Sequence, residues 1–197
     1  MATSKTLNGF QPSRMRGGAY NSSGMNEYSV ANGSDENIFQ GDLVKIVSGK
    51  LQKVSATTDL VAGVFMGAKW VDSTTKQPTW SNYFPADTSS AEDTPTALVL
   101  DDPNATFMIQ ADATVADTQI GLNFDVTLGA GSAITGMSGF GMKGGSGSVQ
   151  SKASRLLRRS TLPGEAASDR YPKFEVKLNQ HRDHYGLGST VSIANLA

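Results

Sequence analysis

The sequence predicts a mainly β fold, either a small β-barrel or a β-sandwich. Its central stretch, residues 38–71, holds two β-rich runs, IFQGDLVKIV and VAGVFMGAKWV, with a tight reversal over residues 47–51 between them. Gly41 and Gly63 lie inside these runs, where glycine usually marks a bulge or a close backbone approach. Apolar side chains recur with the two-residue period of a half-buried strand, and we expect them on one face: Val44, Ile46, Leu51 and Val54.

Shorter β patterns follow toward the C-terminus. Residues 96–101 (TALVLD) and 105–111 (ATFMIQA) flank an Asp-Asp-Pro-Asn turn, so we expect them to pair as an antiparallel hairpin. One helical turn is expected over residues 115–121. The clearest amphipathic strand lies in residues 171–180 (YPKFEVKLNQ), and we expect it to close the barrel or sheet.

The chain divides into a β domain and polar appendages. Residues 1–36 sustain no strand or helix period and are rich in Ser, Gly and Asn, which predicts an extended N-terminal arm ordered by partners. Residues 37–185 are expected to form the β-barrel domain. Within it, residues 129–148 are expected to be a Gly-rich loop that is mobile or ordered by assembly. Residues 186–197 form a C-terminal tail suited to adding a strand to a neighbour.

Composition narrows the classes of function. The 197 residues carry a formal net charge of −1, so bulk charge gives no argument for binding to nucleic acid or to a membrane. The absence of Cys excludes disulfides, thiolate zinc sites and thiol nucleophiles, and it favours folding in a reducing cytosol. No apolar run approaches a membrane-spanning length, and the N-terminus lacks a signal peptide. We therefore expect a soluble protein made inside the cell.

Charge is segregated along the chain. Residues 77–142 contain no Lys or Arg, whereas residues 143–182 contain nine basic residues and three acids. Oppositely charged faces on a near-neutral subunit suit complementary contacts in a repeating array, and the alternative is a set of solvated loops. The side chains expected to contact partners are the basic Arg14, Arg16, Arg155, Arg158 and Arg159, with Phe10 and Tyr20 as anchors in the grooves of another subunit.

Three patterns with chemical potential lack the spacing that their chemistry needs. Residues 139–144 match GxGxxG, but no βαβ unit surrounds them, so no nucleotide site is predicted. The segment HRDH at 181–184 is expected to be a polar turn with hydrogen-bonded imidazoles and not a metal site. The acid pairs at 92–93 and 101–102 do not follow a calcium loop. No triad or phosphate-binding loop is seen, so we expect no enzyme, no cofactor and no metal.

Four motifs occur in order over about residues 37–185. They are IFQGDLV from Ile38, VAGVFMG from Val61 with Trp70 and Tyr83-Phe84-Pro85 behind it, LDDP from Leu100 with Phe107–Gln110, and FEVKLNQH from Phe174. This order resembles that of small virion proteins of tailed phages, of the head decoration (cement) type. The resemblance implies a β-barrel that binds the outer capsid through the major capsid protein, as a symmetric dimer or trimer and without chemistry. The N-terminal arm, the Gly-rich loop and the basic segment 155–159 depart from that pattern.

The expected function is therefore that of a capsid decoration protein on the virion exterior, made in the host cytoplasm. It would stabilise the shell by bridging neighbouring capsomers, with the arm and the Gly-rich loop reaching across them. Deletion of residues 1–36 is expected to leave the barrel folded and to weaken particle binding.

Three alternatives stay open. The alternative nearest to a decoration protein is a component of the tail or of the head–tail connector. A receptor- or carbohydrate-binding knob would stack its ligand on Trp70, Trp80 and Tyr83, although such clusters more often cap one end of a barrel. A small β-barrel enzyme would use the His and Asp side chains of residues 181–184.

Overall fold

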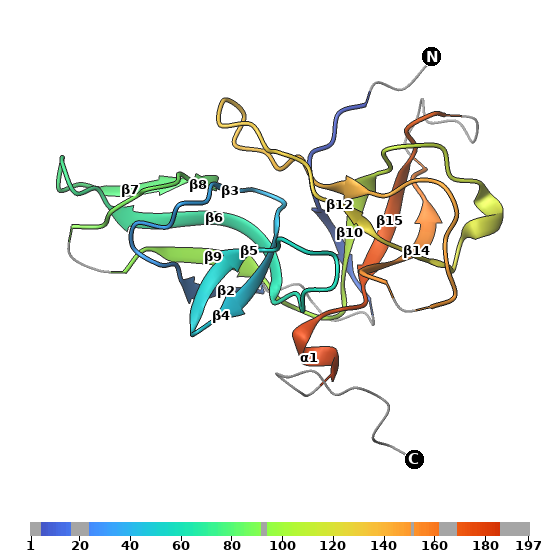
Figure 1. The fold of residues 1–197 in the computed structure, drawn as a ribbon, viewed down its shortest axis with the longest axis horizontal. Helices are drawn as coiled ribbons and strands as arrows, with labels where there is room; N and C mark the ends of the chain where they lie inside the picture. The colour runs from blue at the N-terminus through green and yellow to red at the C-terminus, as the bar shows by residue number, and fades with distance from the viewer. Residues whose placement is uncertain (1–4, 17–23, 92–93, 151, 162–168, 186–197) are drawn as a thin grey trace.

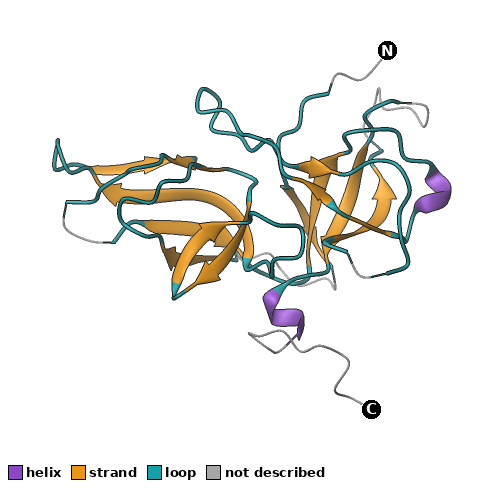
Figure 2. Cartoon of the chain, in the orientation of Figure 1, coloured by secondary structure: helices purple, strands orange, loops and turns teal. Residues whose placement is uncertain are grey.

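The chain folds into two β lobes that lie side by side (Figure 1). The computed structural model describes residues 5–16, 24–91, 94–150, 152–161 and 169–185. Within these ranges strands supply nearly all of the regular structure, and helix is confined to two short turns, η1 (Asp117–Gln119) and α1 (Arg182–Tyr185) (Figure 2). No helix within the described ranges is long and apolar enough to cross a membrane. The predicted mainly β class is confirmed.

One lobe is built on a five-stranded antiparallel sheet. Its strand order is β1 (Gln11–Met15), β10 (Ala105–Gln110), β15 (Lys173–Leu178), β14 (Ser154–Arg159) and β11 (Asn123–Phe124). A two-stranded ribbon, β12 (Val126–Thr127) with β13 (Gly141–Met142), adds to this lobe. The amphipathic pattern of residues 171–180 is confirmed as β15, which lies at the centre of the sheet and not at a closing edge.

The other lobe is built on a six-stranded antiparallel sheet. Its main path is β2 (Met25–Ser29), β9 (Thr96–Leu100), β6 (Gly63–Val71), β4 (Leu43–Val47) and β5 (Lys50–Lys53), and β7 (Pro78–Ser81) also pairs with β6. A short ribbon, β3 (Ile38–Phe39) with β8 (Tyr83–Phe84), lies beside it. The predicted reversal is the two-residue turn Ser48-Gly49, whose φ angles of 50° and 76° suit a hairpin of right-handed twist.

Two hydrophobic clusters fill the lobes. The larger cluster includes Phe10, Phe107 and Phe174 of the five-stranded lobe, but it also takes in Leu43 and other side chains of the six-stranded sheet. The smaller cluster lies within the six-stranded lobe, around Phe65. Of the four apolar side chains expected on one face, Val44, Ile46 and Leu51 pack in the smaller cluster and Val54 in the larger. The described strands form no closed barrel, so open sheets packed in the manner of a sandwich fit best.

The predicted hairpin of residues 96–101 and 105–111 is wrong. β9 pairs with β2 and β6, whereas β10 pairs with β1 and β15, so the two strands belong to different sheets. Each strand already has an antiparallel neighbour on both of its edges and has no free edge to offer the other. The turn over residues 101–104 is therefore a point where the chain crosses between lobes.

The expectation of an arm that buries little against its own domain is wrong for the described part of residues 1–36. β1 and β2 are edge strands of the two sheets, and Phe10 is fully buried with its ring 5.9 Å from that of Phe107. Edge strands expose most of their side chains, so the polar sequence gave no visible period. Phe10 is thus an anchor in its own core and not in a neighbour's groove. Tyr20 lies outside the described residues.

The Gly-rich segment 129–148 is packed within the chain itself, so the prediction of a loop that is mobile or ordered by assembly is wrong. A Cβ on Gly139 would lie 1.9 Å from the carbonyl oxygen of Ala130, so glycine is what lets these backbones approach. Phe140 and Met142 are fully buried, and Gly141–Met142 forms β13 where a nucleotide loop would need a helix start. The tip is the exception, since Ile134 is 97% exposed.

A junction around Asp42 holds these segments together. The buried carboxylate accepts hydrogen bonds from Phe39 N at 2.8 Å and Ser138 Oγ at 2.5 Å, and it lies 3.1 Å from Lys53 Nζ. The preceding residue, Gly41, accepts a bond from Phe10 N at 2.9 Å and donates to Phe65 O at 2.8 Å. The segment around Phe10, the Gly-rich segment and β6 therefore meet at residues 41–42.

The burial of Phe10 predicts that the N-terminal segment contributes to folding stability. Phe10→Ala should lower the free energy of unfolding by about 3–5 kcal/mol, because it leaves a cavity against Phe107. Urea denaturation followed by circular dichroism measures the change. Ile134→Ala, which removes an exposed apolar side chain, should shift stability by less than about 0.5 kcal/mol. Equal effects of the two substitutions would contradict the packing of Phe10.

The contact between Gly139 and Ala130 gives a second stability prediction. Gly139→Ala should destabilise the protein by about 1–3 kcal/mol, because the backbone of residue 130 must move to admit a methyl group. Gly24→Ala is the matched control, since a Cβ there meets nothing within 4 Å. Thermal melts of both variants test the idea, and an unchanged midpoint for Gly139→Ala would show that the segment is loosely held.

Candidate interaction surface

The outer face of the five-stranded sheet gathers basic side chains from three strands. Residues that oppose each other in an antiparallel pair share a face, as do residues two apart on one strand. Arg155 opposes Lys177, Arg158 opposes Glu175, and a shift of register after Leu156 keeps both arginines on the same side. Thr106 opposes both Lys177 and Arg14, which brings β1 onto this face. We call this surface the basic face: Arg14, Arg155, Arg158, Lys173 and Lys177, with Thr106 and Glu175 among them.

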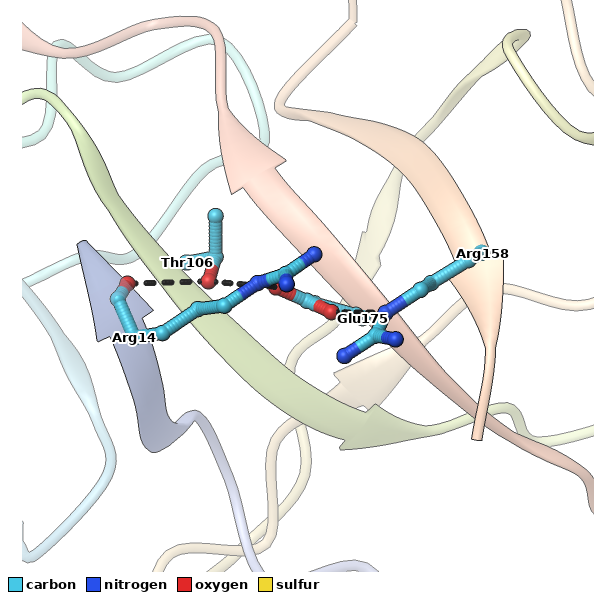
Figure 3. Close-up of polar contacts among 4 residues, drawn as sticks. All are labelled: Arg14, Thr106, Arg158 and Glu175. Carbon is cyan, nitrogen blue, oxygen red and sulfur yellow. Dashed lines mark hydrogen bonds and ion pairs between the residues drawn. The ribbon is translucent and has the colours of Figure 1, made fainter. Parts of the chain in front are cut away.

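Glu175 is the carboxylate at the centre of the basic face (Figure 3). Its side chain is fully buried, although it lies on the outer side of the sheet, because Arg14 and Arg158 fold over it from β1 and β14. Arg14 Nε donates to Oε1 at 2.7 Å, and Arg158 Nε donates to Oε2. The Thr106 hydroxyl donates to Oε1 at 2.6 Å and lies 2.9 Å from the carbonyl oxygen of Arg14. One carboxylate thus orients two guanidinium groups.

The electrostatics agree with this geometry. Burial alone would raise the pKa of Glu175, but the hydrogen bonds from Thr106, Arg158 and Arg14 outweigh it and hold that pKa below its ordinary value. On the same face, burial and the neighbouring positive charge of Arg16 lower the pKa of Lys177. Glu175 therefore stays ionised while the face around it remains positive.

The five arginines proposed from the sequence do not all lie on the basic face. Arg14, Arg155 and Arg158 share the basic face, where Arg155 is exposed and its Nε donates to Gly121 O at 3.1 Å. Arg16 is exposed just beyond β1. Arg159 is not on this face: its guanidinium lies 4.9 Å from the Phe174 ring centre and its Nε donates to Asp117 at 2.6 Å.

Several charges that are separated in sequence are paired within the chain. Asp117 binds Arg159, and Asp125 lies 2.5 Å from Lys152 Nζ. Asp101 accepts hydrogen bonds from Asn26 and Tyr28, and burial together with this carboxylate raises the pKa of Tyr28 to about 12. Part of the segregated charge therefore stabilises the fold, and the expected contacts between copies in an array remain a prediction.

The aromatic platform expected for a carbohydrate-binding knob does not form. Trp70 opposes Thr79 and Trp80 opposes Lys69, so the two indoles lie on opposite faces of the β6–β7 ribbon. Trp70 packs edge-on against Phe84 in the smaller core cluster, whereas Trp80 is 62% exposed. Tyr83 stacks on Phe39 at 5.5 Å and is only partly exposed.

The HRDH segment lies at the C-terminal end of the described residues. His181 is buried, which the sequence did not indicate, and its Nδ1 accepts a hydrogen bond from Asp183 N at 3.2 Å. Residues 182–185 then make the single turn α1. Throughout the described part of the chain, no three His, Cys, Asp or Glu side chains come together in a way that could hold a metal ion.

Sequence reasoning found the arginines of the basic face but missed the two residues that organise them. Glu175 and Thr106 look like ordinary polar positions of alternating strands, and their pairing depends on register across β10 and β15. One weak indication of this role is present in the sequence. Glu175 lies between Lys173 and Lys177 on the same face of one strand, so basic neighbours could be expected.

Comparison of the chain with protein-family models, with curated proteins and with solved structures finds no match in any of the three. The inference on function therefore depends on the geometry of the chain and on the order of its motifs.

The position of Glu175 predicts a pH-dependent stability. Because its pKa is lower in the folded than in the unfolded chain, its contribution is present at neutral pH and is lost as the pH falls below the ordinary glutamate value of about 4.3. Glu175→Gln should lower the free energy of unfolding by about 1–3 kcal/mol at pH 7 and should flatten the loss of stability in acid.

Urea unfolding of wild type and variant between neutral and acidic pH measures both effects. Glu27→Gln is the control, since Glu27 forms a half-exposed pair with Lys69 and should matter by less than about 1 kcal/mol. Parallel pH profiles for wild type and Glu175→Gln would contradict the assignment.

Proposed function

We propose that the protein is a capsid decoration protein of a tailed phage, bound to the outside of the shell through the major capsid protein as a homo-oligomer. The main support for the proposal is the place in the fold of the four motifs that resemble such proteins. Each motif contains residues on which the arrangement of the two lobes depends.

The four motifs occupy different parts of that framework. The first contains Gly41 and Asp42, at the junction of the segments. The second contains Gly63, where a Cβ would lie 2.5 Å from Leu100 O. The third contains the crossing between lobes at residues 101–103, and the fourth is the central strand β15. Two proteins with the same fold would keep the residues on which that fold depends. The resemblance of these motifs therefore supports a fold shared with decoration proteins.

Clamping of the shell is the mechanism that this framework supports. A subunit that contacts two neighbouring capsomers adds its binding free energy to the cost of separating them, and repeated copies multiply modest single contacts. The buried N-terminal segment changes how bridging would occur: Phe10 and β1 are tied into the core, so the subunit would bridge as a rigid body through its exposed faces.

Because β1, β2 and Phe10 pack within the chain itself, the expected result of deleting residues 1–36 also changes. Removal of β1, β2 and Phe10 would take an edge strand from each sheet, so the truncated chain should fail to fold. Point variants on exposed faces are therefore the right way to probe binding.

Co-sedimentation with capsids that lack the protein tests the proposal directly. Saturating binding with on the order of hundreds of copies per shell, following the capsomer symmetry, is expected, together with a raised temperature of shell opening. A count of about a dozen or fewer would assign the protein to the tail, portal vertex or fibres. An absence of binding to capsids would refute the proposal.

A further inference from the structure

We propose that the basic face is a carboxylate-binding site, at which Asp or Glu side chains on the surface of a partner protein dock between Arg14 and Arg158. This inference rests on the proposed function, to which it adds the docking surface and the chemistry of the partner.

Glu175 orients the guanidinium groups of Arg14 and Arg158 but does not occupy all of their hydrogen-bond donors. Each gives its Nε to Glu175, and no hydrogen bond among the described residues uses the terminal Nη nitrogens of either side chain. The side chains of Arg14 and Arg158 remain 54% and 49% exposed. A bound oxyanion therefore meets donors whose rotamers are already restricted, which lowers the entropy cost of binding.

A recess beside Arg158 provides room for a side chain. It has a volume of about 190 Å³ and is lined by Ser13, Met108, Arg158, Arg159, Ser160 and Thr161. Met108 opposes Glu175 across β10 and β15, so the recess opens on the basic face itself. The apolar side chain of Met108, the hydroxyl groups and the two arginines of this lining match the methylene stem and the charged head of Asp or Glu.

The charge distribution favours an acidic protein surface over nucleic acid. A nucleic-acid site gains its affinity by neutralising a run of phosphates, so a site with few cations binds nucleic acid weakly. Here the chain has a net charge of −1, and the basic face is confined to one sheet of one lobe. No exposed aromatic side chain lies among the described residues of this face to stack on a base, since Phe107 and Phe174 point into the core. Isolated carboxylates need only the local complementarity that the face offers.

Direct binding to the purified full-length chain tests the site without capsids. The probe is a hexaglutamate peptide, titrated against ¹⁵N-labelled protein while the Nε–Hε signals of Arg14 and Arg158 are followed. We expect saturable shifts of these signals, and binding at least about tenfold weaker in Arg158→Gln. A DNA oligonucleotide of equal charge is the competitor, and tighter binding of the DNA to the same signals would overturn the choice of partner.

Two further variants separate loss of the site from loss of the fold. Arg155→Gln removes a charge from the basic face without touching Glu175, and it should weaken binding about two- to threefold. Lys50→Gln removes the same charge from β5 in the other lobe and should leave binding unchanged. Each variant is first shown to keep the wild-type melting profile. Equal losses of peptide affinity in Arg158→Gln and Lys50→Gln would show that only net charge matters, and would refute the site.

Capsid co-sedimentation of the same variants links the site to the proposed function. Reduced occupancy of Arg158→Gln with normal occupancy of Lys50→Gln is the expected result. Unchanged occupancy of Arg158→Gln would refute the docking surface and leave the decoration function intact. Peptide binding in the absence of any capsid binding would refute the decoration function and leave the carboxylate site intact.

Discussion

The buried carboxylate of Asp42 is the interaction on which the arrangement of the chain depends. It follows Gly41, whose backbone is bonded to Phe10 and Phe65, and it accepts hydrogen bonds from β3 and from Ser138 of the Gly-rich segment. Lys53 balances its charge and lies over the rings of Phe39 and Phe140. Segments far apart in sequence thus converge on one charged group, and a neutral side chain there would leave several donors without an acceptor.

Asp42 and Glu175 show how donors decide the state of a buried acid. Burial is the largest influence on both carboxyl groups and raises the pKa in each case. At Asp42, one lysine and neutral donors do not compensate, so its pKa stays above the ordinary value. At Glu175, two arginines and a threonine overcome the same cost, and its pKa falls. Asp42 therefore serves the fold at a cost in stability, whereas Glu175 holds its charge and orients the arginines above it.

If the protein decorates a capsid as proposed, the basic face and the packed N-terminal segment favour a rigid docking subunit over a clamp with free arms. A sheet face presents its side chains at fixed spacing, and the Glu175 contacts restrict two of them further. Rigid, pre-ordered contacts lose less entropy on binding than a flexible arm that orders at the partner. Many copies of such a subunit on a symmetric shell would gain by multivalency what each lacks in contact area.

The sequence by itself determined the local features of this protein. The strands around residues 38–71, the tight turn at Ser48-Gly49, the amphipathic strand β15 and the helical turn η1 were all visible, because period, turn chemistry and glycine act over a few residues. The resemblance in motifs also needed only local patterns. The arginines of the basic face could be proposed from their clustering along the chain.

Only the tertiary structure decided which strands pair and which side chains meet. The separation of β9 from β10 and the burial of Phe10 both depend on partners distant in sequence, as does the packing of Gly139 on Ala130. Such contacts leave no period in a single chain, since an edge strand reads as polar coil and a close approach reads as a flexible glycine run. The same reason applies to the site: Arg14, Thr106, Arg158 and Glu175 come from four strands, and register alone brings them onto one face.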